Sequence, residues 1–261
     1  MPSVLAIAAH PDDIEFVMAG TLLRLIDAGW SAHYFNVANG CCGSTEYSRE
    51  HTAQIRLEEA MKAAEAIPAE FYPPIRDDLE IFYDAPTLRE IAAIVRQARP
   101  TIILTHSPVD YMEDHQVVAR LAVTAAFSRG MPNFPTSPPW EPFEHDVAIY
   151  HAQPHGNRDP MGHLIVPTLY VDVSDLIDRK RQLLAHHGSQ AKWLDDSQGM
   201  DSYVETMVQL NREVGLLSEE FEYAEGWRQH LHLGFSAPNF DPLRTAIGPF
   251  VRGSGHDFTS I

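Results

Sequence analysis

The strongest constraint on the fold is the alternation of apolar runs with helix-like segments along the first half of the chain. Residues 4–9 form a continuous apolar run, and "TIILTH" at 101–106 forms another, as in strands that are covered on both faces. Segments with helical spacing of apolar residues follow these runs, which gives the order β-α-β-α-β-α-β-α. The sequence therefore predicts an α/β fold with a mostly parallel sheet and helices on both faces.

The expected elements extend over most of the 261 residues. We expect strands at 4–9, 32–37, 71–72, 101–106, 147–150, 169–173 and, as an edge strand, 221–224. We expect helices at 16–28, 50–66, 87–98, 117–127, 175–185 and 203–214. One domain is predicted to span 1–261, with a long loop at 131–168, a C-terminal extension after about residue 200, and an irregular tail after Ser236.

Charge and cysteine content limit the classes of partner. The formal net charge of −17 argues against a nucleic acid or an anionic lipid surface. No run approaches the roughly 20 apolar residues of a transmembrane helix, and no signal peptide is recognisable. The two cysteines, Cys41 and Cys42, are adjacent and cannot form a disulfide framework. We expect a protein of the cytoplasm.

Ionisable residues follow the first strand directly, in "AAHPDDIE". His10 and Asp13 lie three residues apart in a turn that Pro11 stiffens, so that one turn can present both to the same cation. A catalytic zinc site takes a third protein ligand, and "THSPVDYMEDHQVV" at 105–118 is the obvious donor. His115 and His106 are the two alternatives for that ligand.

Two acidic residues remain beside these ligands. Asp12 is a candidate general base for a metal-bound water, although it is also placed to be a helix N-cap. Asp114 is expected either to cap the helix that begins near His115 or to orient a ligand. Adjacent aspartates at strand ends also bind Mg²⁺ in phosphate-transfer proteins, so the pair alone does not settle the chemistry.

The sequence resembles the LmbE/PIG-L family of metal-dependent N-deacetylases. The resemblance rests on "AAHPDDIEFVMAGTL", "IRLEEAMKAAEAI", "RPTIILTHSPVDYMEDH" and "VDVSDLIDRKRQLLAHHGSQ", and it runs with a gap from about residue 3 to 190. It implies a Rossmann-like sheet and the removal of an acetyl group from an N-acyl amino sugar or its conjugate. Relatives form hexamers or smaller assemblies, which makes a homo-oligomer an expectation here.

The resemblance also implies roles for individual residues. His10, Asp13 and His115 match the family's ligands for Zn²⁺, or for another divalent transition metal, and Asp12 matches its general base. Where relatives often have an oxyanion-stabilising histidine, this chain has Met112, which cannot donate a hydrogen bond.

Further residues are candidates for contact with the substrate. Tyr111, His155 and His187 are candidates to replace the missing donor, with His155 preferred as the catalytic one. Arg56 and Asn39 match substrate-contacting positions. The alternative for Arg56 is a surface ion pair with a neighbouring glutamate, and the alternative for Asn39 is a plain turn.

Two rival functions accompany the zinc-dependent amidase. The first is a non-catalytic, metal-dependent sugar-conjugate binding protein of the same fold, which Met112 favours. The second is a Mg²⁺-dependent phosphotransfer protein that uses Asp12 and Asp13. The acidic net charge and the scarcity of nearby lysines disfavour the second.

Overall fold

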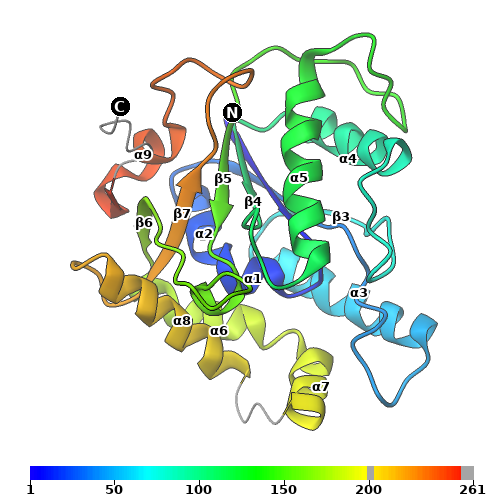
Figure 1. Ribbon diagram of the computed structural model, residues 1–261, viewed down its shortest axis with the longest axis vertical. Coiled ribbons are helices and arrows are strands. Elements are labelled where there is room, and N and C mark those ends of the chain that lie inside the picture. The colour runs from blue at the N-terminus through cyan, green and yellow to red at the C-terminus, as the bar shows by residue number, and fades with distance from the viewer. Residues whose placement is uncertain (199–202, 254–261) are drawn as a thin grey trace.

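A computed structural model describes residues 1–198 and 203–253 of the chain and has one eight-stranded sheet in this part (Figure 1). Its strands, in the spatial order β3-β2-β1-β4-β5-β7-β6-β8, are Glu70–Tyr72, Ser31–Asn36, Ser3–Ala8, Ile102–Thr105, Ala148–Ala152, Ala224–Gln229, Leu169–Asp172 and Val251–Gly253. The first five are parallel, whereas β7 and β8 run antiparallel to their neighbours. The prediction of an α/β fold with a mostly parallel sheet is confirmed.

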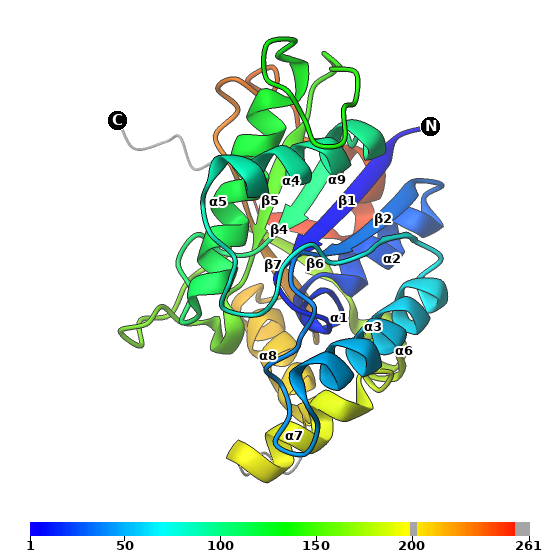
Figure 2. The same ribbon diagram turned by 90° about the vertical axis from the view of Figure 1, so that its right-hand side faces the viewer.

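Helices cover both faces of this sheet (Figures 1 and 2). The helices of the described residues are α1 Asp13–Val17, α2 Ala19–Asp27, α3 Arg49–Ala66, α4 Ala85–Ala98, α5 Glu113–Phe127, α6 Ile177–Leu184, α7 Gly188–Gln198, α8 Tyr203–Leu217 and α9 Pro242–Ile247. α4 and α5 pack on one face, and α2, α3, α6 and α9 pack on the other. No helix among them is long and apolar enough to cross a bilayer.

The central strand β1 is apolar because both of its faces are covered. Val4 and Ala6 belong to the core beneath α2 and α3, whereas Leu5 and Ile7 belong to the core beneath α4 and α5. All four side chains are fully buried. A strand with two buried faces gains hydrophobic free energy from every residue, which explains the continuous apolar run.

Two predicted helical segments differ from the structure. The expected helix at 16–28 is two helices, α1 and α2, which are separated at Met18. The first of them, α1, begins at Asp13, directly after the His10 turn. The helix α7 was not predicted, because its first residues, Gly188 and Ser189, are typical of a turn.

The C-terminal region also corrects two expectations. The predicted edge strand at 221–224 is wrong, because β7 begins at Ala224 and lies inside the sheet between β5 and β6. The charged residue Glu225 gives β7 the sequence of an exposed strand. Glu225 is in fact buried, and Lys180 forms an ion pair with its carboxylate. The tail after Ser236 is not irregular throughout, since it contains α9, which Asp241 caps, and the strand β8.

The strand order reverses beside β1. The chain adds β2 and β3 on one side of β1 and then β4 and β5 on the other. In open α/β sheets, ligands bind outside the carboxyl ends of the strands at such a switch point. His10 follows β1 and His106 follows β4, so both histidines lie at this point.

Candidate active site

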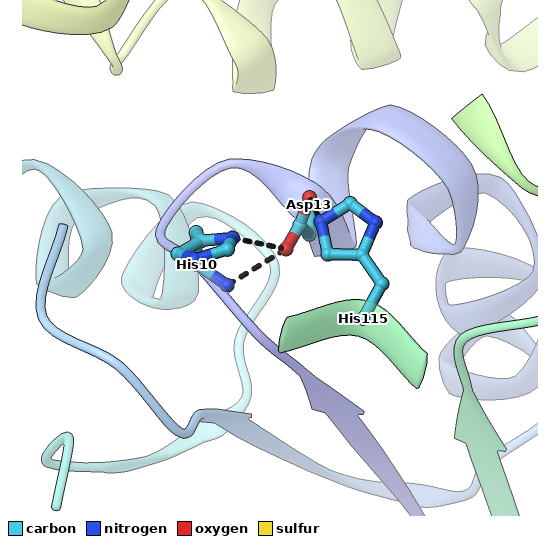
Figure 3. A group of neighbouring side chains, drawn as sticks. All are labelled: His10, Asp13 and His115. Carbon is cyan, nitrogen blue, oxygen red and sulfur yellow. Dashed lines mark hydrogen bonds and ion pairs between the residues drawn. The ribbon is translucent and has the colours of Figure 1, made fainter. Parts of the chain in front are cut away.

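Three side chains from two separate segments meet at the switch point. His10 and Asp13 come from the turn after β1, and His115 comes from the first turn of α5. Asp13 lies between the two imidazole rings (Figure 3). One nitrogen of each ring and one Asp13 oxygen lie within 4.8 Å of one another. Imidazole and carboxylate at this spacing are a donor set that suits zinc, with room for a further ligand.

Asp13 organises this cluster. Its Oδ2 accepts a 2.7 Å hydrogen bond from the His10 backbone N–H and lies 3.5 Å from His10 Nδ1. Its Oδ1 lies 3.4 Å from His115 Nε2. Burial raises the pKa of Asp13, but the histidines outweigh it and hold the pKa well below its usual range. Asp13 is therefore an ionised carboxylate, as a metal ligand must be.

The pKa values of His10 and His115 shift in the opposite direction to that of Asp13. Burial lowers the pKa of His10, but the hydrogen bonds to Asp114 and Asp13 outweigh it and raise the pKa to about 9. Burial likewise lowers the pKa of His115, whereas Asp13 and Asp110 raise it to about 10. Without a metal, protons thus take the place of a cation between these rings and the carboxylate.

His106 and Asp110 support the cluster from the β4 side. The Ala9 backbone N–H donates a 2.9 Å hydrogen bond to His106 Nε2, and this nitrogen also lies 3.3 Å from Asp13 Oδ2, so it already has partners within the protein. The His106 ring stacks on His115 with centroids 4.1 Å apart. Asp110 Oδ1 lies 3.1 Å from His115 Nδ1, at an angle unsuited to a hydrogen bond. This geometry favours His115 over His106 as the third ligand.

Asp114 lies behind His10 and not in the cavity. Its Oδ2 accepts a 2.9 Å hydrogen bond from His10 Nε2 and a 2.8 Å hydrogen bond from the backbone N–H of Leu79. This arrangement fixes the ring of His10 and turns Nδ1 toward Asp13. Of the two expected roles, the structure shows the orienting contact and no side-chain cap of α5.

Asp12 is buried beside the cluster and has a left-handed backbone, with φ of 108°. It stands at the N-cap position of α1, as the alternative expected, but its side chain makes no capping hydrogen bond. The hydroxyl of Tyr203 donates to Asp12 Oδ2, and Arg56 Nη2 lies 3.4 Å from the same oxygen. Burial raises the pKa of Asp12, and Arg56 opposes this effect. Because Oδ2 is occupied, Oδ1 is the oxygen that can accept a proton.

Arg56 is buried and faces the site, which excludes the surface ion pair with a glutamate. Its guanidinium also donates to the carbonyl oxygen of Pro11. The loop after β2 passes very close to it. A Cβ at Gly40, whose φ is +77°, would lie 2.5 Å from Arg56 Cδ, so only glycine fits there. Arg56 thus links the His10 turn to the 40–43 loop.

A cavity of about 430 Å³ opens above these residues. Tyr111, Met112 and His155 line it together with Arg56 and Asp12. The rings of Tyr111 and His155 are 5.8 Å apart, and burial lowers the pKa of His155, which keeps its imidazole neutral. The structure therefore brings two of the three candidate donors to the cavity that Met112 faces.

Two expected substrate-contacting residues do not line this cavity. His187 is fully buried beneath it, where Nε2 lies 3.1 Å from Glu15 Oε2. Asn39 donates to Asp77 and accepts a 3.1 Å hydrogen bond from the Cys41 N–H, as in the turn that was its alternative. Contact with a substrate at these two positions would need a rearrangement.

Sequence reasoning missed several residues at the site. Tyr203 lies 191 positions from Asp12, and nothing in its surroundings in the sequence indicates the contact. Gln190 and Trp193 line the cavity from the unpredicted helix α7. Asp110 could have been found, because it is an acid in the same "VDYMEDH" segment as His115.

Comparison with known proteins identifies relatives of this chain. The family described as "PIG-L: GlcNAc-PI de-N-acetylase" matches residues 5–126, which include the His10 turn and His115. The diacetylchitobiose deacetylase of Thermococcus kodakarensis is 30% identical over 195 residues, which cover 72% of this chain and 69% of that protein. The 4-oxalmesaconate hydratase of Pseudomonas putida is 26% identical over 240 residues, which cover 86% of this chain and 87% of that protein.

Among solved structures, the N,N'-diacetylchitobiose deacetylase from Pyrococcus horikoshii superimposes with a TM-score of 0.74. The match covers 92% of this chain and 88% of that chain at 23% sequence identity. At this identity, the likeness shows the fold alone.

Proposed function

Since this chain belongs to the PIG-L family of de-N-acetylases, we propose that it is a metal-dependent hydrolase that removes an acyl group from an N-acyl amino sugar or its conjugate. The observation that carries the proposal is that one turn supplies both a candidate metal ligand, Asp13, and a candidate general base, Asp12. Asp13 faces two imidazoles, and the adjacent Asp12 lines the same cavity with a carboxylate whose Oδ1 has no hydrogen-bond partner among the described residues. A deacetylase relative at 30% identity supports an acetyl group as the one removed.

We propose Zn²⁺, held by His10, Asp13 and His115, as the cofactor. The donor set fits this ion, because two imidazole nitrogens and one carboxylate oxygen converge within 4.8 Å. When bound, zinc polarises a carbonyl group and lowers the pKa of water to near 7. Asp114 fixes the ring of His10 so that only Nδ1 is available to the ion.

Asp12 is assigned the proton transfer. Tyr203 and Arg56 hold its Oδ2, and this leaves Oδ1 to accept the proton of the attacking water. Its raised pKa then allows the protonated carboxyl to give the proton to the leaving amine. The left-handed backbone of Asp12 fits a residue whose position is dictated by function and not by local preference.

His155 is assigned the role of the missing oxyanion donor. It lines the cavity, and no hydrogen-bond partner of its ring is found among the residues that the structure describes. A neutral imidazole keeps one N–H to donate to a developing oxyanion. Tyr111 is the alternative donor, since its ring also packs against His115 with centroids 5.9 Å apart.

The test is the release of amine and acetate from N-acetylglucosamine and diacetylchitobiose by the zinc-loaded protein. We expect turnover in the wild type and a large loss in His155→Gln. His163→Gln is the matched control, because His163 lies in the same 131–168 loop but is exposed and outside the cavity. If Tyr111→Phe loses this activity and His155→Gln keeps it, Tyr111 and not His155 is the oxyanion donor. No turnover of any N-acyl amino sugar would overturn the proposed function.

A second candidate is the addition of water to a carbon–carbon double bond of an unsaturated carboxylate. Its supporting observation is Met112, which faces the cavity where a deacetylase needs a donor, together with the longer match to the hydratase. A hydratase would bleach the ultraviolet absorbance of 4-oxalmesaconate without releasing an amine. The two assays therefore separate the candidates.

The cytoplasmic location and the homo-oligomer stay predictions. Free Cys41 and Cys42 are consistent with a reducing compartment.

A further inference from the structure

A second cavity lies between residues of α5 and β7. It occupies about 420 Å³, and its lining includes Tyr83, Arg120, Thr124, His151, Arg228 and His230. Among the residues that the structure describes, none lines both this cavity and the active-site cavity. Its volume is within the range of small-molecule sites. We call it the Arg228 cavity.

The charge of the Arg228 cavity contrasts with that of the whole chain. The chain has 36 acidic and 19 basic residues, yet none of the described lining residues is acidic. Arg120 stacks its guanidinium over the Tyr83 ring at 4.7 Å, and no ion pair of Arg120 is found among the described residues. In contrast, Arg49 and Arg76 each pair with a carboxylate. The cavity is thus a cationic site in an acidic protein.

Arg228 lies in this cavity and has no counter-ion within residues 1–198 and 203–253. Its Nη2 donates hydrogen bonds of 2.8 Å to Ser107 Oγ and 3.2 Å to the Ala152 carbonyl. Its Nε is buried and unpartnered, and no carboxylate of the described residues lies within ion-pair distance of the guanidinium. Burial lowers the pKa of Arg228. Arg228 is partly buried, and a charge that is partly removed from water without a carboxylate partner carries a desolvation cost that an anion in the cavity would offset.

The two histidines of the cavity supply polarity but no negative charge. His151 Nδ1 donates a 2.8 Å hydrogen bond to the His106 carbonyl, so its Nε2 accepts from His230 Nδ1 at 3.0 Å. Burial, with His230 and Arg228 nearby, lowers the pKa of His151 to about 4. Both hydrogen bonds fix the rings. Arg228 and Arg120 therefore provide the charge that a ligand would meet.

We propose that the Arg228 cavity binds a small organic monocarboxylate. Arg228 has an unpartnered Nε inside the cavity and balances a single negative charge, whereas Arg120 is exposed and its guanidinium is already stacked over the Tyr83 ring. A phosphate would bring a second negative charge next to Arg228. Pro108, Val123 and Leu231 also line it and would contact an apolar part of the ligand. The site goes beyond the proposed hydrolase function and does not depend on it.

The test uses 4-fluorobenzoate as the probe, titrated against the full-length protein and followed by ¹⁹F NMR. We expect saturable binding to the wild type, displaced by benzoate more readily than by inorganic phosphate. Arg228→Gln should weaken binding roughly 10- to 100-fold, as expected for the loss of a hydrogen bond to a charged group. Arg212→Gln is the matched control, because Arg212 is exposed on α8 and does not line the cavity.

Circular dichroism establishes that each variant is folded. If Arg228→Gln does not fold, binding of 4-fluorobenzoate is measured instead for Arg228→Lys and for Arg120→Gln, which changes an exposed residue. Weaker binding in both variants supports the proposal. Three results would overturn it: no saturable binding to the wild type, unchanged binding in a folded Arg228→Gln, or tighter binding of phosphate than of benzoate. Because the assay does not measure hydrolysis, its failure is distinct from failure of the proposed function.

Discussion

Replacing Asp114 with alanine should weaken zinc binding even though Asp114 is not a predicted ligand. The carboxylate accepts hydrogen bonds from His10 Nε2 and the Leu79 N–H, and it holds the His10 ring with Nδ1 toward Asp13. A hydrogen bond to a charged group contributes about 1.5–3 kcal/mol, which corresponds to a loss of affinity of roughly 10- to 100-fold. The His10 ring is then free to rotate away from the cluster.

The assay is competition for zinc between the protein and a chelating indicator, at a temperature where both proteins are folded. Glu113→Ala is the matched control, because Glu113 lies in the same first turn of α5 but is exposed. We expect Glu113→Ala to bind zinc like the wild type. A folded Asp114→Ala protein that binds zinc with wild-type affinity would refute the reasoning, since His10 would then be either correctly oriented without Asp114 or no ligand at all.

Three further predictions concern the same region. Elemental analysis should find about one zinc per chain in the wild type and much less in His115→Ala and Asp13→Ala. Retention of zinc in both variants would refute the ligand assignment. Asp12→Asn should keep its zinc but lose roughly 10²- to 10⁴-fold in kcat, and wild-type turnover in this variant would exclude Asp12 as the base. Burial lowers the pKa of His187, but Glu15 raises it more, so the net shift is above 6.5. The folded state therefore binds this proton more tightly, and its stabilisation, complete below about pH 6.5, is lost as the pH rises through the folded pKa. Thermal melts should show this decline in the wild type and a weaker one in His187→Gln, and identical declines would contradict the assignment.

Local pattern explains why most of the fold and the turn that joins His10 to Asp13 could be predicted. The apolar run of β1 is visible in the sequence because both faces of that strand are buried. His10 and Asp13 are three residues apart, so the turn that joins them is encoded locally. By contrast, β7 was misplaced because its buried charge, Glu225, is neutralised by Lys180, a residue 45 positions away.

The sequence by itself determined the α/β class, the placement of His10 and Asp13 at a strand end, and His115 as an alternative third ligand. Only the tertiary structure bears on the choice between His115 and His106, and it favours His115, because the Ala9 N–H donates to His106 Nε2. It alone showed that Tyr203, which comes after β6 in the chain, donates a hydrogen bond to Asp12. The physical reason is range: strand periodicity and turn geometry act between neighbours in the chain, whereas hydrogen bonds and burial in a site act between neighbours in space.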